Sequence, residues 1–243
     1  MALKTIDPFT YSAFIAETGE SIRAIVDRFN NEDPEFWLNT LRRYSFREQD
    51  HQSGERVRLQ FNKALSSCSG NEELYAVANR ILEWGGMPPL NGTMKQGLES
   101  SLLYLKLLAK GEPINLGQVC VERLASITKV YEMWDLNNWV IYDSYCVRGL
   151  QWLISVFWAS VGHKENEGLL KLPWPPGRVG LPVAGFPRAA DTAPHQKRLG
   201  FIYGSWLCKA IAERLAITSN NSFHWRPYHV EMFAFQIGHE VKG

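Results

Sequence analysis

The chain has 243 residues, of which 45% are apolar and 12% aromatic, enough to fill the core of one large domain or of two closely packed lobes. Its 26 Lys and Arg residues nearly balance its 25 Asp and Glu residues, which leaves a net charge of +1. Global charge therefore does not indicate a nucleic-acid binder, and any basic surface must be local.

The cysteines and the apolar runs exclude further classes. The four cysteines are far apart in the sequence and form no C-x-x-C pair, so no zinc or iron–sulfur site is indicated. We expect neither a metal nor a cofactor. The N-terminal residues lack an apolar signal core, and the strongest apolar run, WLISVFWASVG, is too short to cross a bilayer. The expectation is a reduced, cytoplasmic protein without a membrane partner.

Apolar residues recur at helical spacing along almost the whole chain. The pattern predicts helices over residues 10–30, 34–46, 54–68, 71–84, 93–110, 141–162, 197–216 and 226–241. Residues 115–134 look like two more helical pieces, joined near Ala125 to Thr128. We therefore predict an all-α fold, a bundle of about nine or ten helices. It would form one all-helical domain over residues 1–243, with a division into lobes 1–111 and 112–243 left open.

Residues 172–196, LPWPPGRVGLPVAGFPRAADTAPHQ, are rich in proline and glycine and have no period. Loops of this length inside a compact domain are usually functional or mobile. The segment contains Trp174, which no helix explains and which is as suited to facing a ligand as to packing. It also carries Arg178 and Arg188, which belong to a local basic set.

The segment SITKVYEMWDLNNWVIYDSYCVRGL, residues 126–150, contains the best catalytic candidates, Lys129 and Asp143. Taken alone, a lysine near a helix start is usually solvated, and an aspartate there is usually an N-cap. The flanking residues favour a second interpretation. ERLASITKVYEMW resembles the helix–hairpin–helix element of the base-excision DNA glycosylase superfamily, and WVIYDSYCVRGL resembles the segment that follows it. The corresponding positions are Leu124, Lys129, Asp143, Ser144, Val147 and Arg148.

The resemblance implies a lysine nucleophile and a charge-stabilising carboxylate. Lys129 would attack the anomeric carbon of the sugar and form a Schiff base, while Asp143 would activate the attack or stabilise positive charge on the sugar. It implies a bifunctional glycosylase/AP lyase that acts on DNA and lacks the iron–sulfur cluster of some relatives. The expected contacts to nucleic acid are Ser126 and Thr128, which stand where the family has hairpin glycines, together with Arg148, Arg178 and Arg188.

A base that leaves the stack needs an aromatic pocket. The candidates are Trp84, Trp139, Tyr142 and Trp174. For Trp139 and Tyr142 core packing is the alternative. Trp84 precedes Gly85 and Gly86, which either end a helix or form a tight loop that faces the pocket.

Two further groups of charged residues receive structural expectations. Glu231 is predicted to be a helix cap or a buried helix–helix partner rather than a metal ligand. Arg58 belongs to a basic set that also includes Arg42, Arg43, Arg47 and Arg56, and such a set usually forms a solvated face that can contact phosphates.

Two alternatives to a catalytic glycosylase stay open. One is a non-catalytic protein that keeps the fold and only binds nucleic acid. The other is a helical protein-interaction module, for example in a prokaryotic defence system, whose aromatic residues form a partner surface.

Overall fold

The computed structural model describes residues 9–161, 193–218 and 223–241. Within these ranges the protein is all-α, with nine α-helices and one 3-10 helix, so the predicted fold class is confirmed. In chain order the helices are α1 (Tyr11–Glu32), α2 (Phe36–Arg42), α3 (His51–Ser66), α4 (Asn71–Trp84), α5 (Gly92–Ala109), η1 (Leu116–Gln118), α6 (Leu124–Trp134), α7 (Ser144–Val161), α8 (Pro194–Thr218) and α9 (Pro227–Glu240).

Side-chain caps explain where several helices begin. Helices α1, α3, α5 and α7 each start at a residue whose polar side chain accepts a hydrogen bond from a backbone N–H of the first turn. These capping residues are Thr10, Asp50, Asn91 and Asp143 respectively. Helix α9 begins with Pro227 at its first position, where a missing N–H costs nothing. The start of α8 at Pro194 assigns the last residues of the expected 172–196 loop to a helix, and residues 172–192 lie outside the described ranges.

The expected break near Ala125 to Thr128 is wrong, because α6 is continuous from Leu124 to Trp134. Thr128 donates its hydroxyl hydrogen to the carbonyl of Leu124 at 2.9 Å, a local bond that a helix tolerates. The chain changes direction earlier, at Arg123, whose φ of 48° lies in the left-handed region. The Arg123 guanidinium donates to the carbonyls of Pro88 and Pro89 at 2.6 and 2.9 Å. This ties the start of α6 to the loop after α4.

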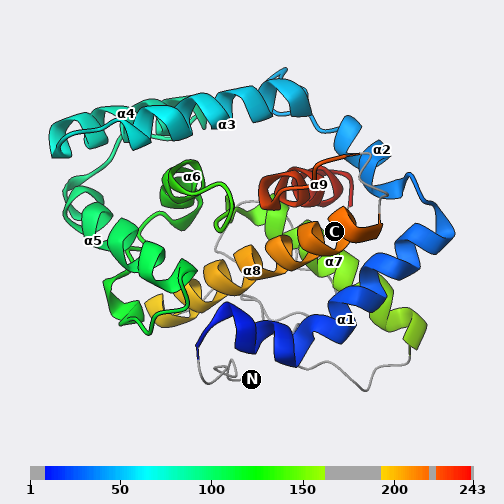
Figure 1. The fold of residues 1–243 in the computed structure, drawn as a ribbon. Helices are drawn as coiled ribbons and strands as arrows, with labels where there is room; N and C mark the ends of the chain where they lie inside the picture. The colour runs from blue at the N-terminus through cyan, green and yellow to red at the C-terminus, as the bar shows by residue number, and fades with distance from the viewer. Residues whose placement is uncertain (1–8, 162–192, 219–222, 242–243) are drawn as a thin grey trace.

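The helices pack in two groups that do not follow the division at residue 111. Helices α3, α4, α5 and α6 pack on one another, whereas α1 and α2 join α7, α8 and α9. Figure 1 shows α6 and α9 close to end-on in the centre, with α3 and α4 on one side and α8 on the other. The buried residues of both groups belong to one hydrophobic cluster. The two groups are joined where Arg58 of α3 bonds Glu132 of α6 and Glu231 of α9.

Helices α7 and α9 pack most extensively because two glycines let their backbones touch. A Cβ on Gly149 would collide with the carbonyl oxygen of Ala234, and a Cβ on Gly238 would collide with that of Tyr145. This contact fixes the start of α7, and with it Asp143, against α9.

A tight turn between α2 and α3 supports the end of α4. Phe46 and Gln49 exchange two backbone hydrogen bonds of 3.0 Å, and the residues between them, Arg47 and Glu48, have φ values of 51° and 66°. The Arg47 guanidinium donates to the carbonyls of Glu83 at 3.1 Å and Trp84 at 2.7 Å. The turn therefore caps the C-terminal end of α4.

Among the helices in the described ranges, none is both long and apolar enough to span a bilayer.

Candidate active site

Lys129 lies on α6 and is buried, with 3% of the residue exposed. Its side chain passes directly over Gly85, where an added Cβ would lie 2.5 Å from Lys129 Cδ and 2.6 Å from Cε. Within the described part of the chain, Nζ forms no hydrogen bond and no ion pair. The alternative of a solvated surface lysine therefore does not apply.

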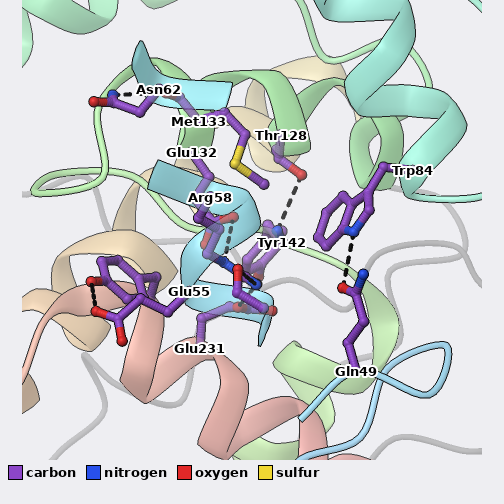
Figure 2. A network of polar contacts seen from close by, with 12 residues as sticks. Gln49, Glu55, Arg58, Asn62, Trp84, Thr128, Glu132, Met133, Tyr142 and Glu231 are labelled. Carbon is purple, nitrogen blue, oxygen red and sulfur yellow. Dashed lines mark hydrogen bonds and ion pairs between the residues drawn. The ribbon is translucent and has the colours of Figure 1, made fainter. Parts of the chain in front are cut away.

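Asp143 is the N-cap of α7, as the sequence predicts. Its Oδ1 accepts the backbone N–H groups of Tyr145 at 3.0 Å and Cys146 at 2.9 Å. The preceding residue is fixed to α6, because the N–H of Tyr142 donates to Oγ1 of Thr128 at 3.1 Å (Figure 2). The residues that precede Lys129 and Asp143 are therefore in direct contact.

A buried ionic cluster lies between the two helix groups. Arg58 of α3 is fully buried and donates through Nε to Glu132 Oε2 at 3.1 Å and through Nη2 to Glu231 Oε2 at 2.7 Å. Figure 2 shows the guanidinium between the two carboxylates, Glu132 on α6 and Glu231 on α9. The prediction that Glu231 is a buried helix–helix partner is confirmed.

Lys129 and Asp143 both act on this cluster. Burial raises the pKa of Glu231 well above its usual range against the opposing effect of Arg58, while Glu132 and Asp143 raise it further and Lys129 lowers it. Burial also raises the pKa of Glu132, which Arg58 and Lys129 oppose. Lys129 and Asp143 therefore influence the pKa of Glu231 in opposite directions.

Trp84 is the pocket candidate that lies beside Lys129. It is the last residue of α4, is half-buried, and immediately precedes the glycine under the lysine side chain. Its Nε1 donates to Gln49 Oε1 at 3.1 Å, and the Arg58 guanidinium lies 5.6 Å from the ring centroid. These contacts hold the indole in place (Figure 2).

Trp139 and Tyr142 lie in the core, as the packing alternative predicts. Both are fully buried, and both rings pack against Phe201 of α8, at 5.6 and 6.4 Å between centroids. Tyr142 also fills the space at Gly204, where a Cβ would lie 2.5 Å from its ring. Neither ring faces a surface that a base can reach, because α8 covers them. Trp174 lies outside the described residues.

The expected phosphate contacts are not presented as the resemblance implies. Ser126 and Thr128 are 5% and 0% exposed within α6, so neither lines a hairpin that can touch a phosphate. Arg148 is also buried, at 5%, and in the described ranges its Nε has no hydrogen-bond partner. Arg178 and Arg188 lie outside the described residues.

The sequence assigned Arg58 to an exposed basic set, and the structure places it at the centre of the site. A signal was present, because Arg58 follows Gly54 by four residues and precedes Leu65 by seven, and this spacing places all three on the buried face of α3. Gln49 was also missed, since only the folded turn brings it to Trp84.

Open hollows lie elsewhere on the molecule. One of about 590 Å³ is lined by residues of α1, α2 and α8, and one of about 610 Å³ by residues of α1 and α8. A third, of about 570 Å³, is lined by residues of α5, η1 and α8. Lys129 lines none of these three. Among the described residues no three His, Cys, Asp or Glu side chains are grouped to hold a metal ion. In comparisons with known proteins, no family model, no curated protein and no solved structure matches this chain. Function is therefore inferred from the geometry around Lys129.

Proposed function

We propose that this protein is a DNA glycosylase that removes a damaged or modified base through a Schiff base on Lys129. The observation that carries the proposal is the burial of Lys129 over Gly85, without a hydrogen bond or ion pair in the described part of the chain. Structural lysines normally reach solvent or a counter-ion, whereas a nucleophilic lysine must keep its nitrogen free.

Each side chain has a role in the proposed reaction. The Nζ lone pair forms a bond to C1′ of the deoxyribose, and the electrons of the glycosidic bond leave with the base. The new secondary ammonium loses a proton, which neutralises the departing base, and ring opening then gives the imine. Asp143 stabilises the positive charge that develops on the sugar. An imine at C1′ also permits strand cleavage, so base removal and lyase activity belong to one site.

Trp84 supplies the proposed stacking surface for the extruded base. A flipped base needs an apolar ring to replace the stack that it has left. Trp84 is half-buried and next to Gly85, and Gln49 and Arg58 fix its ring. Oxidised guanine, an alkylated purine and a modified cytosine all suit such a surface, so a panel of duplexes with these lesions would define the substrate.

Borohydride trapping tests the proposal directly. Purified protein is mixed with a duplex that carries an abasic site or an oxidised base, and borohydride reduces any imine to a stable adduct. We expect an adduct with the wild type and none with Lys129→Gln. The matched control is Lys110→Gln, which removes an exposed lysine at the end of α5 and should leave the adduct unchanged.

The charge of Asp143 can be separated from its capping role. Asn caps helices about as well as Asp, so Asp143→Asn should keep the hydrogen bonds to Tyr145 and Cys146 and the thermal midpoint. Adduct formation should nevertheless fall by about 100-fold, the order of magnitude for removing one preorganised electrostatic group. Asp143→Ala should lower both the adduct and the stability.

The same experiments can also contradict the proposed glycosylase function. An absent wild-type adduct together with salt-sensitive DNA binding would replace this proposal with the binding-only function. If DNA is not bound even at low salt, both nucleic-acid functions fail and the interaction module is left.

A further inference from the structure

A hollow of about 590 Å³ lies where the end of α1, the start of α2 and the end of α8 come together, and the residues just before α9 complete its wall. Small-molecule sites are usually hollows of about 300–1,000 Å³ that are lined by aromatic side chains and a few polar groups. Neither Lys129 nor Asp143 lines this hollow. Its occupant would therefore be separate from the DNA substrate of the proposed function.

Two aromatic rings form a corner in the wall of this hollow. Phe223 and Trp225 both line it, their ring centroids are 4.9 Å apart, and their planes are inclined at 66°. A third ring, that of Trp37 on α2, also lines it. The face of an aromatic ring carries partial negative charge, and several rings set at an angle are the arrangement that holds quaternary ammonium groups. The wall therefore favours a ligand with a diffuse positive charge.

The charged residues of the wall are acidic. Among the described residues that line the hollow are Asp27 and Glu35, and no Lys, Arg or His. Asp27 is neutralised by Arg214, whose Nη2 lies 2.7 Å from each carboxylate oxygen. Glu35 has a looser ion pair, with Oε2 3.9 Å from Nη1 of Arg42. The charge of Glu35 is therefore the one left to attract a ligand, and it attracts a cation.

The indole N–H of Trp37 lacks an acceptor. Trp37 is 1% exposed, and in the described part of the chain its Nε1 has no hydrogen-bond partner. A buried N–H that is left unbonded is unfavourable, and an oxygen of a ligand in the hollow would remove that cost. A carboxylate oxygen would bring a negative charge into a wall that already holds Asp27 and Glu35. A neutral hydroxyl or carbonyl oxygen is therefore the better acceptor.

We propose that this hollow binds a small organic ammonium cation that also carries a neutral hydroxyl or carbonyl oxygen. The alkylated nitrogen lies against the rings of Phe223 and Trp225, and Glu35 supplies the opposite charge. The oxygen of the ligand accepts the N–H of Trp37. Each part of such a ligand matches a separate feature of the wall, namely the ring faces, the acidic charge and the unbonded donor. Choline has this composition and is the probe for the experiments below.

A neutral analogue of the same shape tests whether the positive charge is recognised. In the alcohol dimethylbutanol, carbon replaces the nitrogen of choline, so shape and hydroxyl are kept and the charge is lost. Calorimetric titration of the full chain should give an affinity for choline about fivefold or more above that for the neutral alcohol, as expected for a cation on aromatic faces. Equal or tighter binding of the neutral alcohol would overturn the inference and assign the hollow to an uncharged ligand.

Glu35→Gln and Glu32→Gln form a matched pair of variants. The side chains of Glu35 and Glu32 are 61% and 58% exposed and each pairs with an arginine, but only Glu35 lines the hollow. Glu35→Gln should weaken choline binding about threefold, as expected for an exposed charge, and leave binding of the neutral alcohol unchanged. Glu32→Gln should alter neither. Equal choline affinity in the two variants would contradict the placement of the cation in this hollow.

Trp37→Phe tests the hydrogen bond, because it keeps an aromatic ring and removes the N–H. Choline binding should weaken about fivefold, the order of magnitude for one hydrogen bond. Binding of tetramethylammonium, which has no oxygen, should stay the same.

The indole N–H resonance of Trp37 in an NMR spectrum of the wild type gives a second measurement that does not depend on the stability of the variant. It should shift when choline is added and stay in place with tetramethylammonium. A resonance that does not move at saturating choline, or an absence of choline binding, would overturn the inference. Borohydride trapping on DNA would be unaffected by that result, so the proposed function stands or falls separately.

Discussion

At the scale of single residues, Gly85 controls where Lys129 lies. Its φ of −72° suits any residue, so only the lysine side chain limits this position. Gly85→Ala should displace Lys129 Cδ and Cε, and adduct formation should fall by about 100-fold, as expected when a reacting atom is misplaced by about 1 Å. Adduct yield and the denaturant midpoint, measured on the same preparation, check this expectation.

Gly92→Ala is the control for that substitution. Gly92 begins α5, and a Cβ added there meets nothing within 4 Å. This variant should retain full adduct formation. Equal activity of Gly85→Ala and Gly92→Ala would mean that Lys129 does not need its present path.

His229 should make stability depend on acid pH. Burial lowers its pKa from 6.5 to about 4, although Glu55 opposes the shift. Between pH 6.5 and pH 4, His229 is therefore protonated in the unfolded chain and neutral in the folded protein. The stabilisation is complete above pH 6.5 and is lost as pH falls toward 4, by about 3 kcal/mol in total. Urea unfolding of wild type and His229→Gln at several pH values would show this slope in the wild type only.

The exposed His239 provides the comparison, because it is on the same helix and its replacement leaves the interior untouched. His239→Gln should keep the wild-type slope between pH 6.5 and pH 4. Parallel curves for His229→Gln and the wild type would show that His229 is not the group responsible.

Single-residue predictions succeeded where local chemistry decides the role. Asp143 was predicted as an N-cap from its place before an apolar helix, and Glu231 as a buried partner from its place among apolar residues. The spacing of Arg58 in α3 indicates that it is buried, but nothing in that helix shows that carboxylates on α6 and α9 bind it. The sequence could not show that Trp139 and Tyr142 are core residues and that Trp84 is not, because burial by α8 depends on the tertiary structure.

At the scale of elements, the close packing of α7 on α9 is the most sensitive feature. Gly149→Ala would push a Cβ into the backbone of Ala234, which cannot move without displacing the whole of α9. We expect a loss of about 3 kcal/mol or more in the free energy of unfolding. Gly238→Ala should cost as much because it meets the carbonyl of Tyr145. Urea denaturation measures both, and losses no larger than that of Gly92→Ala would contradict the contact.

Helices with a clear apolar period were predicted to within a few residues. Helices α1, α4, α5, α8 and α9 fall where their spacing and caps place them. The error at α6 arose because Ser126 and Thr128 were placed at the hairpin positions of the family that the segment resembles, while in the structure the Thr128 hydroxyl bonds within α6 and to the N–H of Tyr142. Hydroxyl side chains disrupt a helix only when their local bonds replace those of the helix.

At the scale of the whole molecule, Arg58 joins the two helix groups. Arg58→Met leaves two buried carboxylates without a partner, and we expect a loss of about 3–5 kcal/mol at neutral pH. The loss should shrink as pH falls, because protonated carboxyl groups are tolerated in the interior. Denaturant titrations at pH 5 and pH 8 measure both effects.

A triple variant tests the cause of that loss. Replacing Arg58 by Met, Glu132 by Leu and Glu231 by Met removes every charge of the cluster and should recover most of the stability. If the triple variant is no more stable than Arg58→Met, the packing of the guanidinium, rather than its charge balance, holds the groups together.

The grouping of helices was beyond what periodicity predicts. The spacing of apolar residues identifies a buried face but not which other face covers it, so α1 and α2 were assigned with α3 to α5 by sequence order. In the structure they pack on α7, α8 and α9 (Figure 1). Lys129 and Asp143 were proposed from sequence and stay a prediction, whereas the bonds of Arg58 to Glu132 and Glu231 were not foreseen.

The burial of Lys129 also limits how fast the protein can work. Only 3% of this residue is exposed, and Gly85 packs directly on its side chain. Under the proposed function, we expect a nucleotide to reach Nζ only after the residues packed on this side chain have moved, so that capture passes through a transient open form. With protein in excess, the rate of adduct formation should level off at the rate of that opening. A ceiling shared by different lesions would identify the helix end, rather than the base, as the slow step.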